Sequence, residues 1–179
     1  MTAVGFAVFD TPIGRCAAAW SARGLVRVFL PEGRDRETRA RLRRECPGAA
    51  EAAPAGDVRR AIERIQALLA GTRADLSSVR LDMDEVPAFH RRIYEAARAI
   101  PPGSTLSYGE VAVRAGTPGA ARAVGQALGR NPFPIVVPCH RVLAARGRMG
   151  GFSAHGGVRT KARLLSIEGV VTASHVGQT

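Results

Sequence analysis

The eight residues 135–142 constrain this chain more than any other part of its sequence. They read Ile-Val-Val-Pro-Cys-His-Arg-Val, so an apolar β-branched run is followed directly by a thiol, an imidazole and a guanidinium. The run 135–137 predicts a short buried strand or extended core segment. Pro138 lacks a backbone donor and has a fixed φ, so it ends any ladder there. Cys139 is therefore expected at the end of a rigid apolar segment, where a reactive atom can be held still.

The residue types around Cys139 suit nucleophilic chemistry by sulfur. Only the thiolate attacks carbon, so the thiol needs a base or a nearby positive charge. His140 can be that base through a turn or a water, because neighbours in an extended segment point apart, and Arg141 adds positive potential. Glu168 is the candidate for orienting the imidazole, since a carboxylate in a partly apolar helical pattern usually has a partner. The alternative is a small buried hydrophobe at Cys139, as free cysteines often are.

The cysteines and the apolar runs argue against several classes of protein. Cys16, Cys46 and Cys139 are odd in number and far apart, which disfavours a disulfide framework or a zinc site and suits a reducing cytosol. No run approaches the roughly 18 apolar residues of a membrane span. The N-terminus lacks the basic start of a signal peptide. We therefore expect a cytoplasmic protein with no metal in its active site and no membrane partner; the sequence leaves open whether a structural metal binds the N-terminal domain.

The charge of the chain is distributed unevenly. Residues 1–85 hold 14 Arg against 12 Asp or Glu, a net of +2, whereas residues 86–179 hold 11 Arg and one Lys against three Glu, a net of +9. A basic half joined to a near-neutral half indicates a polyanion partner for the basic half. GC-rich coding explains why Arg outnumbers Lys, but it does not explain why acidic residues almost vanish after Glu85.

The pattern before Glu85 predicts a small antiparallel sheet with helices. Short apolar runs between turn residues predict strands at 6–9, 16–20 and 25–30. The charged stretch 34–44 is compatible with a helix, and helical spacing of apolar residues predicts another over 58–69. We expect a loop at 47–56 and a further strand at 76–81.

The pattern after Glu85 is helical. An apolar face predicts a helix over 89–100, and Ser107 is the expected N-cap of a helix over 108–115. A turn at 116–119 leads to a helix over 120–128. Two short helices joined by a Gly-containing turn of about four residues are typical of a helix-turn-helix.

Several motifs resemble those of the O6-alkylguanine-DNA alkyltransferases, or methylated-DNA–protein-cysteine methyltransferases. Pro138-Cys139-His140-Arg141-Val142 resembles the active-site signature of that family. The other matches follow the family's order between Val86 and Gly169: the first DNA-site helix at 107–112, the recognition helix at 120–125, the hinge Asn131-Pro132, and the closing helix with Leu164-Leu165 and Glu168-Gly169. Weaker matches at 11–14 and 24–25 extend toward the N-terminus.

The resemblance implies repair of O6-alkylguanine by irreversible, stoichiometric transfer of the alkyl group to Cys139, with O4-alkylthymine as a further candidate substrate. It implies no cofactor, a monomer, and double-stranded DNA containing alkylated guanine as the partner, so the protein would be nucleoid-associated when on DNA. The fold class implied is α/β (α+β), with a small N-terminal antiparallel sheet with helix and a mostly helical, winged-helix-like C-terminal domain. The expected bounds are an N-terminal domain over 1–85, a DNA-binding and active-site domain over 86–170 and a tail over 171–179.

The same resemblance assigns the site residues. The catalytic set is Cys139, His140, Glu168 and Asn131, and the set contacting DNA and base is Tyr108, Ala120, Ala121, Arg122, Gly125, Arg141, Val142 and Ser153. Guanine O6 lies inside the duplex, so a fixed thiol reaches the alkyl carbon only if the base is flipped out. Arg122, alone among small residues, would fill the vacated space, while Tyr108 would help rotate the nucleotide and Ser153 would steady O6.

The loop after the active-site motif departs from the family pattern in two ways. Phe152 stands where Tyr is common in the family, and Ala154-His155 lengthens the loop, so the pocket is expected to differ in shape.

Two rival functions remain open. One rival is a damage sensor that flips lesions without removing the alkyl group, although related non-catalytic proteins usually lack the cysteine. The other is a Cys-His hydrolase, which requires an oxyanion hole and a substrate groove that the sequence does not display.

Overall fold

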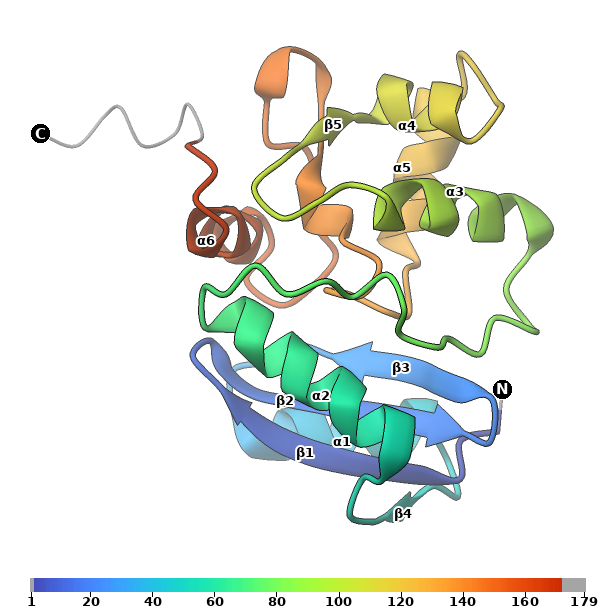
Figure 1. Cartoon of the computed structure of the whole chain (residues 1–179), viewed down its shortest axis with the longest axis vertical. Helices are drawn as coiled ribbons and strands as arrows, with labels where there is room; N and C mark the ends of the chain where they lie inside the picture. Colours follow the sequence, from blue (N-terminus) through green and yellow to red (C-terminus); the bar gives the residue numbers. More distant parts are fainter. Residues whose placement is uncertain (1, 172–179) are drawn as a thin grey trace, which may run out of the picture. The chain divides into compact units, whose positions relative to one another are not determined.

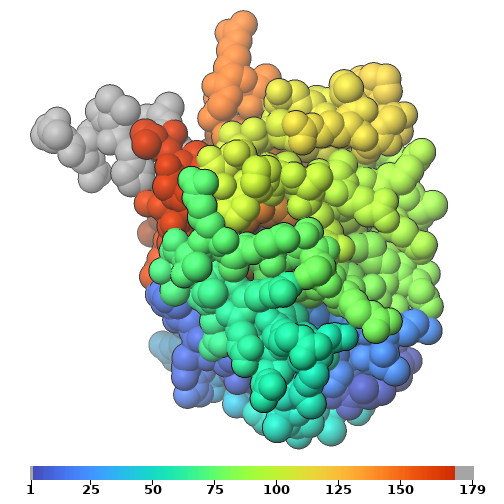
Figure 2. All heavy atoms as spheres, viewed as in Figure 1, coloured from blue at the N-terminus to red at the C-terminus, as the bar shows by residue number. Residues whose placement is uncertain are grey.

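The computed structural model describes residues 2–171, the coloured part of the chain in Figures 1 and 2. The chain forms two compact units. Unit 1 contains the chain up to Val86 together with Pro132–Val136, and unit 2 contains Pro87–Asn131 and the chain from Val137 onward. The tail expected at 171–179 lies outside the described residues, apart from its first residue. No helix among the described residues is long and apolar enough to cross a membrane.

Unit 1 is built on a four-stranded sheet in the order β3-β2-β1-β4 (Figure 1). β1 (Gly5–Thr11), β2 (Gly14–Ser21) and β3 (Gly24–Phe29) pair antiparallel, which confirms the sheet expected from the sequence. β4 (Ala50–Glu51) pairs with β1 in parallel, inside the stretch for which we expected only a loop. A strand of two residues carries no alternation that a sequence pattern could reveal.

The expected strand over 76–81 is wrong. Only Leu81 forms a bridge, to Leu25, and the preceding residues turn. The cause is local, because the Asp75 carboxylate accepts hydrogen bonds from the backbone N–H and the hydroxyl of Ser77, at 2.8 and 2.9 Å. Such a side-chain turn competes with a ladder for the backbone groups.

Two helices cover the sheet of unit 1. α1 (Asp35–Glu45) and α2 (Gly56–Leu69) lie on opposite faces of it (Figure 1). Alternate residues of the strands therefore point into two apolar layers. The layer against α1 contains Phe6, Ala17, Ala19, Val26 and Phe29 with Leu42 and Cys46.

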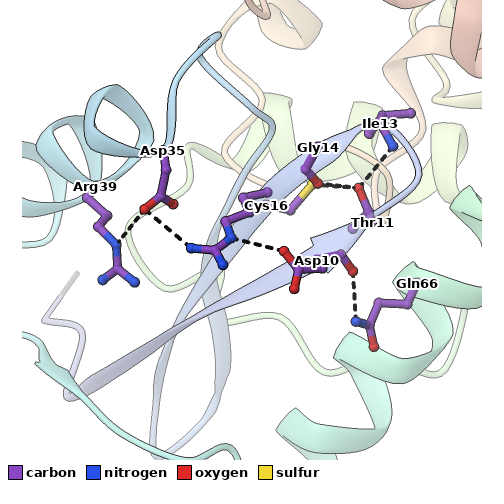
Figure 3. A network of polar contacts seen from close by, with 9 residues as sticks. Asp10, Thr11, Ile13, Gly14, Cys16, Asp35, Arg39 and Gln66 are labelled. Carbon is purple, nitrogen blue, oxygen red and sulfur yellow. Dashed lines mark hydrogen bonds and ion pairs between the residues drawn. The ribbon is translucent and has the colours of Figure 1, made fainter.

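A partly exposed polar network connects the elements of unit 1 (Figure 3). Arg15 of β2 donates to Asp10 at 2.9 Å and to Asp35 of α1 at 3.5 Å, and Arg39 donates to the same Asp35 oxygen at 3.2 Å. Gln66 of α2 donates to the Asp10 carbonyl at 2.9 Å. Exposed ion pairs of this kind add little to stability because water screens them, but these contacts neutralise Arg15 and Arg39 within unit 1.

Unit 2 is mainly helical, as expected. Its helices are α3 (Ala88–Arg98), α4 (Tyr108–Arg114), α5 (Ala121–Gly129) and α6 (Val158–Ile167). Ser107 caps α4 as predicted: its hydroxyl accepts from Glu110 N at 3.1 Å, and the Glu110 carboxylate accepts from Ser107 N at 2.7 Å. Two short strands, β5 (Leu106–Ser107) and β6 (Val142–Leu143), pair in parallel and have no counterpart in the sequence analysis.

The segment that precedes the active-site motif is a buried loop. Residues 135–137 are buried, as expected, but 135–136 form a turn in place of the short strand or extended core segment that the run predicts. We call Pro132–Val136 the strap. Val28 of β3 donates its N–H to the Pro132 carbonyl at 2.9 Å. Ile135 and Val136 form a turn in which Ile135 has φ of 75°, a left-handed conformation that is costly for a β-branched residue. Burial and the anchoring hydrogen bond override the β propensity of the run.

Candidate active site

Cys139 begins a single turn of 3-10 helix, η1 (Cys139–Arg141). The turn is fixed by hydrogen bonds from Cys139 N to the Val137 carbonyl at 2.8 Å and from Arg141 N to the Pro138 carbonyl at 2.9 Å. The turn replaces the extended geometry in which neighbouring side chains would diverge. The Cys139 side chain is almost buried, at 8% exposed.

The surroundings of the sulfur favour a protonated thiol at rest. Burial raises the pKa of Cys139, while a hydrogen bond from the Asn131 side chain and the charge of Lys161 act in the opposite direction. Asn131 also donates its amide Nδ2 to the Val137 carbonyl at 2.8 Å, so the side chain spans the ends of the strap. A thiol of raised pKa needs a base before it can attack.

His140 has the geometry of such a base. The ring is 1% exposed, and Nε2 lies 2.8 Å from Glu168 Oε1. Burial lowers the pKa of His140, although Glu168 raises it, so the imidazole is neutral near pH 7. With the Nε2 proton directed at Glu168, Nδ1 carries the free lone pair, and Nδ1 is buried without a hydrogen-bond partner among the described residues.

Glu168 collects donors from three directions. Besides His140, its oxygens accept from Arg141 Nε at 2.9 Å, from Arg141 Nη2 at 2.8 Å and from Gly103 N at 3.3 Å. Burial alone would raise the pKa of Glu168, but the hydrogen bonds from His140 and Arg141 outweigh it and bring the pKa to about 2. The carboxylate therefore stays ionised and holds the imidazole in one orientation.

Arg141 and Val142 do not lie where the sequence assigned them. Arg141 is 5% exposed, and Nη1 donates to the Ile100 carbonyl at 2.6 Å while Nε and Nη2 bind Glu168. Its guanidinium is thus an internal partner of Glu168 rather than a DNA contact. Val142 is also fully buried, in β6. Both residues support the structure around His140 and Glu168. A sequence motif cannot show whether a residue next to the cysteine points inward in this way or contacts a ligand.

Lys161 is a site residue that the sequence analysis missed. Its side chain is 0% exposed, and Nζ donates to the carbonyls of Val142 at 2.7 Å and Gly151 at 3.2 Å. Nζ also lies 5.7 Å from the centre of the Tyr108 ring. Burial lowers the pKa of Lys161 to about 8, against the raising effect of the Cys139 thiolate. An ammonium group in this position stabilises negative charge on the sulfur.

A cavity of about 400 Å³ opens onto the sulfur, a size in the usual range for small-molecule pockets. It lies within unit 2, and its walls are Tyr108, Gly125, Leu128, Gly129, Cys139, Gly151, Phe152 and Ser153. Three residues that the sequence analysis assigned to the set contacting DNA and base lie in this wall: Tyr108, Gly125 and Ser153. Gly150, which precedes the wall residue Gly151, packs closely against Tyr108: its φ is 66°, and a Cβ there would lie 3.1 Å from Tyr108 Oη.

Arg122 lies on the helix that forms one wall of the cavity. It precedes Gly125 by three residues and Gly129 by seven on α5, so the three share one face of the helix. The side chain is exposed and makes no hydrogen bond or ion pair with any residue in the described part of the chain. Ala120, at the N-cap of α5, and Ala121 are half-buried and leave the start of the helix without bulk.

Comparisons with known proteins agree with this geometry. A family model described as "6-O-methylguanine DNA methyltransferase, DNA binding domain" matches residues 88–170. The chain is 35% identical over 159 residues to a methylated-DNA–protein-cysteine methyltransferase of Methanothermobacter thermautotrophicus, covering 89% of this chain and 82% of that one. It is 36% identical to the Mycobacterium bovis protein of the same name, covering 92% of each. The solved structure of Mycobacterium tuberculosis OGT in complex with DNA superposes with a TM-score of 0.76 at 35% identity, covering 92% of each chain.

Proposed function

This chain belongs to the methylated-DNA–protein-cysteine methyltransferase family, and on that premise we propose that it repairs O6-alkylguanine in double-stranded DNA. The alkyl group is transferred to Cys139, once per molecule. The observation that carries the proposal is the cavity beside Cys139, with a neutral His140 oriented by an ionised Glu168. O4-alkylthymine is a further candidate substrate.

The transfer is an in-line displacement at the alkyl carbon. The sulfur of Cys139 forms the new S–C bond as the C–O6 bond of guanine breaks, and His140 Nδ1 takes the thiol proton through a water. Burial and the nearby thiolate raise the pKa of Tyr108, so its hydroxyl remains protonated and can give a proton to the departing guanine. Ser153 holds O6, and Lys161 offsets the charge of the sulfur before attack.

The thioether product explains the single turnover. A carbon–sulfur bond of this kind is not hydrolysed under mild conditions, so no step regenerates the thiol. Donor and acceptor are both present in the protein–DNA complex, and the reaction needs no cofactor. We further propose that the chain acts as a cytoplasmic monomer, nucleoid-associated when on DNA, with an N-terminal domain over 1–85 and a catalytic domain over 86–170.

Intact-mass and peptide analysis tests this function. After incubation with duplex DNA containing O6-methylguanine, we expect one added methyl group, about 14 Da, on the peptide that contains Cys139. Cys139→Ser should gain none, and Cys16→Ser should behave as the unaltered chain does. A label on Cys16 or Cys46, or several methyl groups removed per molecule, contradicts the mechanism. Binding without any label would identify a damage sensor, and thiol-dependent ester cleavage would identify a hydrolase.

A further inference from the structure

A projecting loop rich in arginine follows β6. We call Ala144–Arg148 the arginine loop. It is closed by a hydrogen bond from Ala144 N to the Arg148 carbonyl at 2.8 Å, and both of its arginines, Arg146 and Arg148, are exposed. Figure 2 shows the orange segment that contains it standing out from the surface of unit 2. Arg146 has φ of 61°, a left-handed conformation that costs stability in any residue other than glycine.

The charge of the arginine loop is not neutralised by the protein. Arg146 makes no ion pair within residues 2–171, and Arg148 only donates to the Ala145 carbonyl at 3.4 Å. No Asp or Glu occurs between His140 and Gly157. Several arginines of unit 1 differ in this respect, since carboxylates bind Arg15, Arg23, Arg39 and Arg41. Two uncompensated cations on one short loop form a site for an anion outside the chain.

The arginine loop is tied to the walls of the cavity. β6 pairs with β5, so the loop begins beside Ser107, the residue that caps α4. The chain leaves the loop through Gly150, which packs against the Tyr108 hydroxyl, and continues into the wall residues Gly151–Ser153. The cavity is thus bordered by α5, which carries Arg122, and by the chain that carries the arginine loop.

We propose that the arginine loop is a second phosphate-binding contact for duplex DNA, separate from the helices α4 and α5. The identity of the polyanion rests on the proposed function. Arg146 and Arg148 each engage a backbone phosphate of the duplex, and they give affinity without sequence preference because a phosphate contact carries no base information. The left-handed backbone of the exposed Arg146 is consistent with this contact, because backbone strain recurs at ligand-binding positions.

Salt titrations of binding to undamaged duplex DNA test the proposal, because no alkyl transfer is involved. The double variant Arg146→Gln/Arg148→Gln should bind more weakly, and its plot of log affinity against log salt should be shallower by about 2, or 0.9 per lost phosphate contact. The matched control Arg36→Gln/Arg73→Gln removes two exposed cations from unit 1 and should leave the slope unchanged. Equal slopes for both double variants and the unaltered chain would overturn the proposal.

Two single variants separate charge from folding. Arg146→Lys keeps a point charge and should keep the slope, whereas Arg146→Gly relieves the left-handed strain, should unfold at no lower a temperature, and should lose about 1 from the slope. A slope that falls in the Lys variant as much as in the Gly variant contradicts a phosphate contact. The unaltered chain could bind duplex DNA with the expected slope although Cys139 gains no methyl group. That result would contradict the proposed alkyl transfer but not the proposed phosphate contact of the arginine loop.

Discussion

At the scale of single residues, Glu168 determines the protonation of the site. It holds His140 by one oxygen, and the Arg141 guanidinium stabilises its negative charge. Because its pKa in the folded chain is about 2, against an ordinary value near 4.5, the ionised carboxylate contributes stability that is fully present above pH 4.5. That contribution is lost as the pH falls toward 2, because protonation then breaks the pair.

Replacing Glu168 tests both its roles. Glu168→Gln should slow methyl transfer about tenfold or more at pH 7 and raise the apparent thiol pKa, while DNA affinity changes little. The variant should also be less stable at pH 7 by about 3 kcal/mol, since Arg141 loses a buried partner, and its stability should vary less between pH 4.5 and 2. Urea unfolding at several pH values and single-turnover kinetics measure these effects. Glu95→Gln, at an exposed site on α3, is the control, and a normal transfer rate for Glu168→Gln would remove this carboxylate from the site.

Single residues also show where sequence reasoning succeeds and fails. The pairing of His140 with Glu168 was predictable, because a carboxylate on a partly apolar helix requires a partner. Arg141 was misassigned, since a motif lists neighbours without saying which of them point inward. Lys161 was missed, although its position in the sequence could have identified it as a site residue. It is the only lysine in a chain with 25 arginines, and it shares a helix face with Leu164 and Leu165.

At the scale of elements, Arg122 is the one charged residue of α5, a helix built largely of small and apolar residues. If Arg122 fills the gap left by the flipped base, Arg122→Ala should slow repair of duplex DNA about tenfold or more, because flipping costs a few kcal/mol. Transfer from the free modified base should stay within about twofold, since no stack has to be opened. Single-turnover rates on both substrates measure the difference. Arg114→Ala, on an exposed position of α4, is a control of equal charge. Equal slowing on duplex and free base would show that Arg122 supports the fold instead.

The elements that sequence analysis predicted are those with local determinants. α4 and α2 have a cap or an apolar period of their own, and both were expected within a few residues of their observed bounds. β4, β5 and β6 are two residues long each and exist through their partners, so no period marks them. The turn at Ile135 opposes the propensity of its own sequence and depends on tertiary contacts.

At the scale of the whole molecule, the strap connects the core of unit 1 to the active-site motif through the chain itself. Phe133 in the strap is 0% exposed. Phe133→Ala should destabilise the chain by about 3–5 kcal/mol through the cavity it leaves. It should also slow transfer at temperatures where the chain remains folded, because loosening the strap loosens Pro138 and Cys139.

A second buried phenylalanine gives the matched control for that prediction. Phe29, on β3, is also fully buried in unit 1 but lies far from Cys139 along the chain. Phe29→Ala should cost a similar free energy of unfolding and leave the transfer rate of the folded protein nearly unchanged. Calorimetry and single-turnover kinetics at about 15 °C compare the two variants. Identical rates in both would show that the strap does not position the thiol.

Because the strap belongs to unit 1 but lies far along the chain, unit 1 cannot be completed during translation until the strap has been synthesised. The ribosome releases residues up to Val86 first, and these include β3 with the Val28 amide that the strap will later bind. All of Pro87–Asn131 must follow before Pro132–Val136 emerges, so a nascent unit 1 waits with one edge of its sheet unfinished. The strap residues that complete this edge come just before Pro138 and Cys139 in the sequence. The nucleophile thus enters the chain only when the segment that immobilises it has already been synthesised.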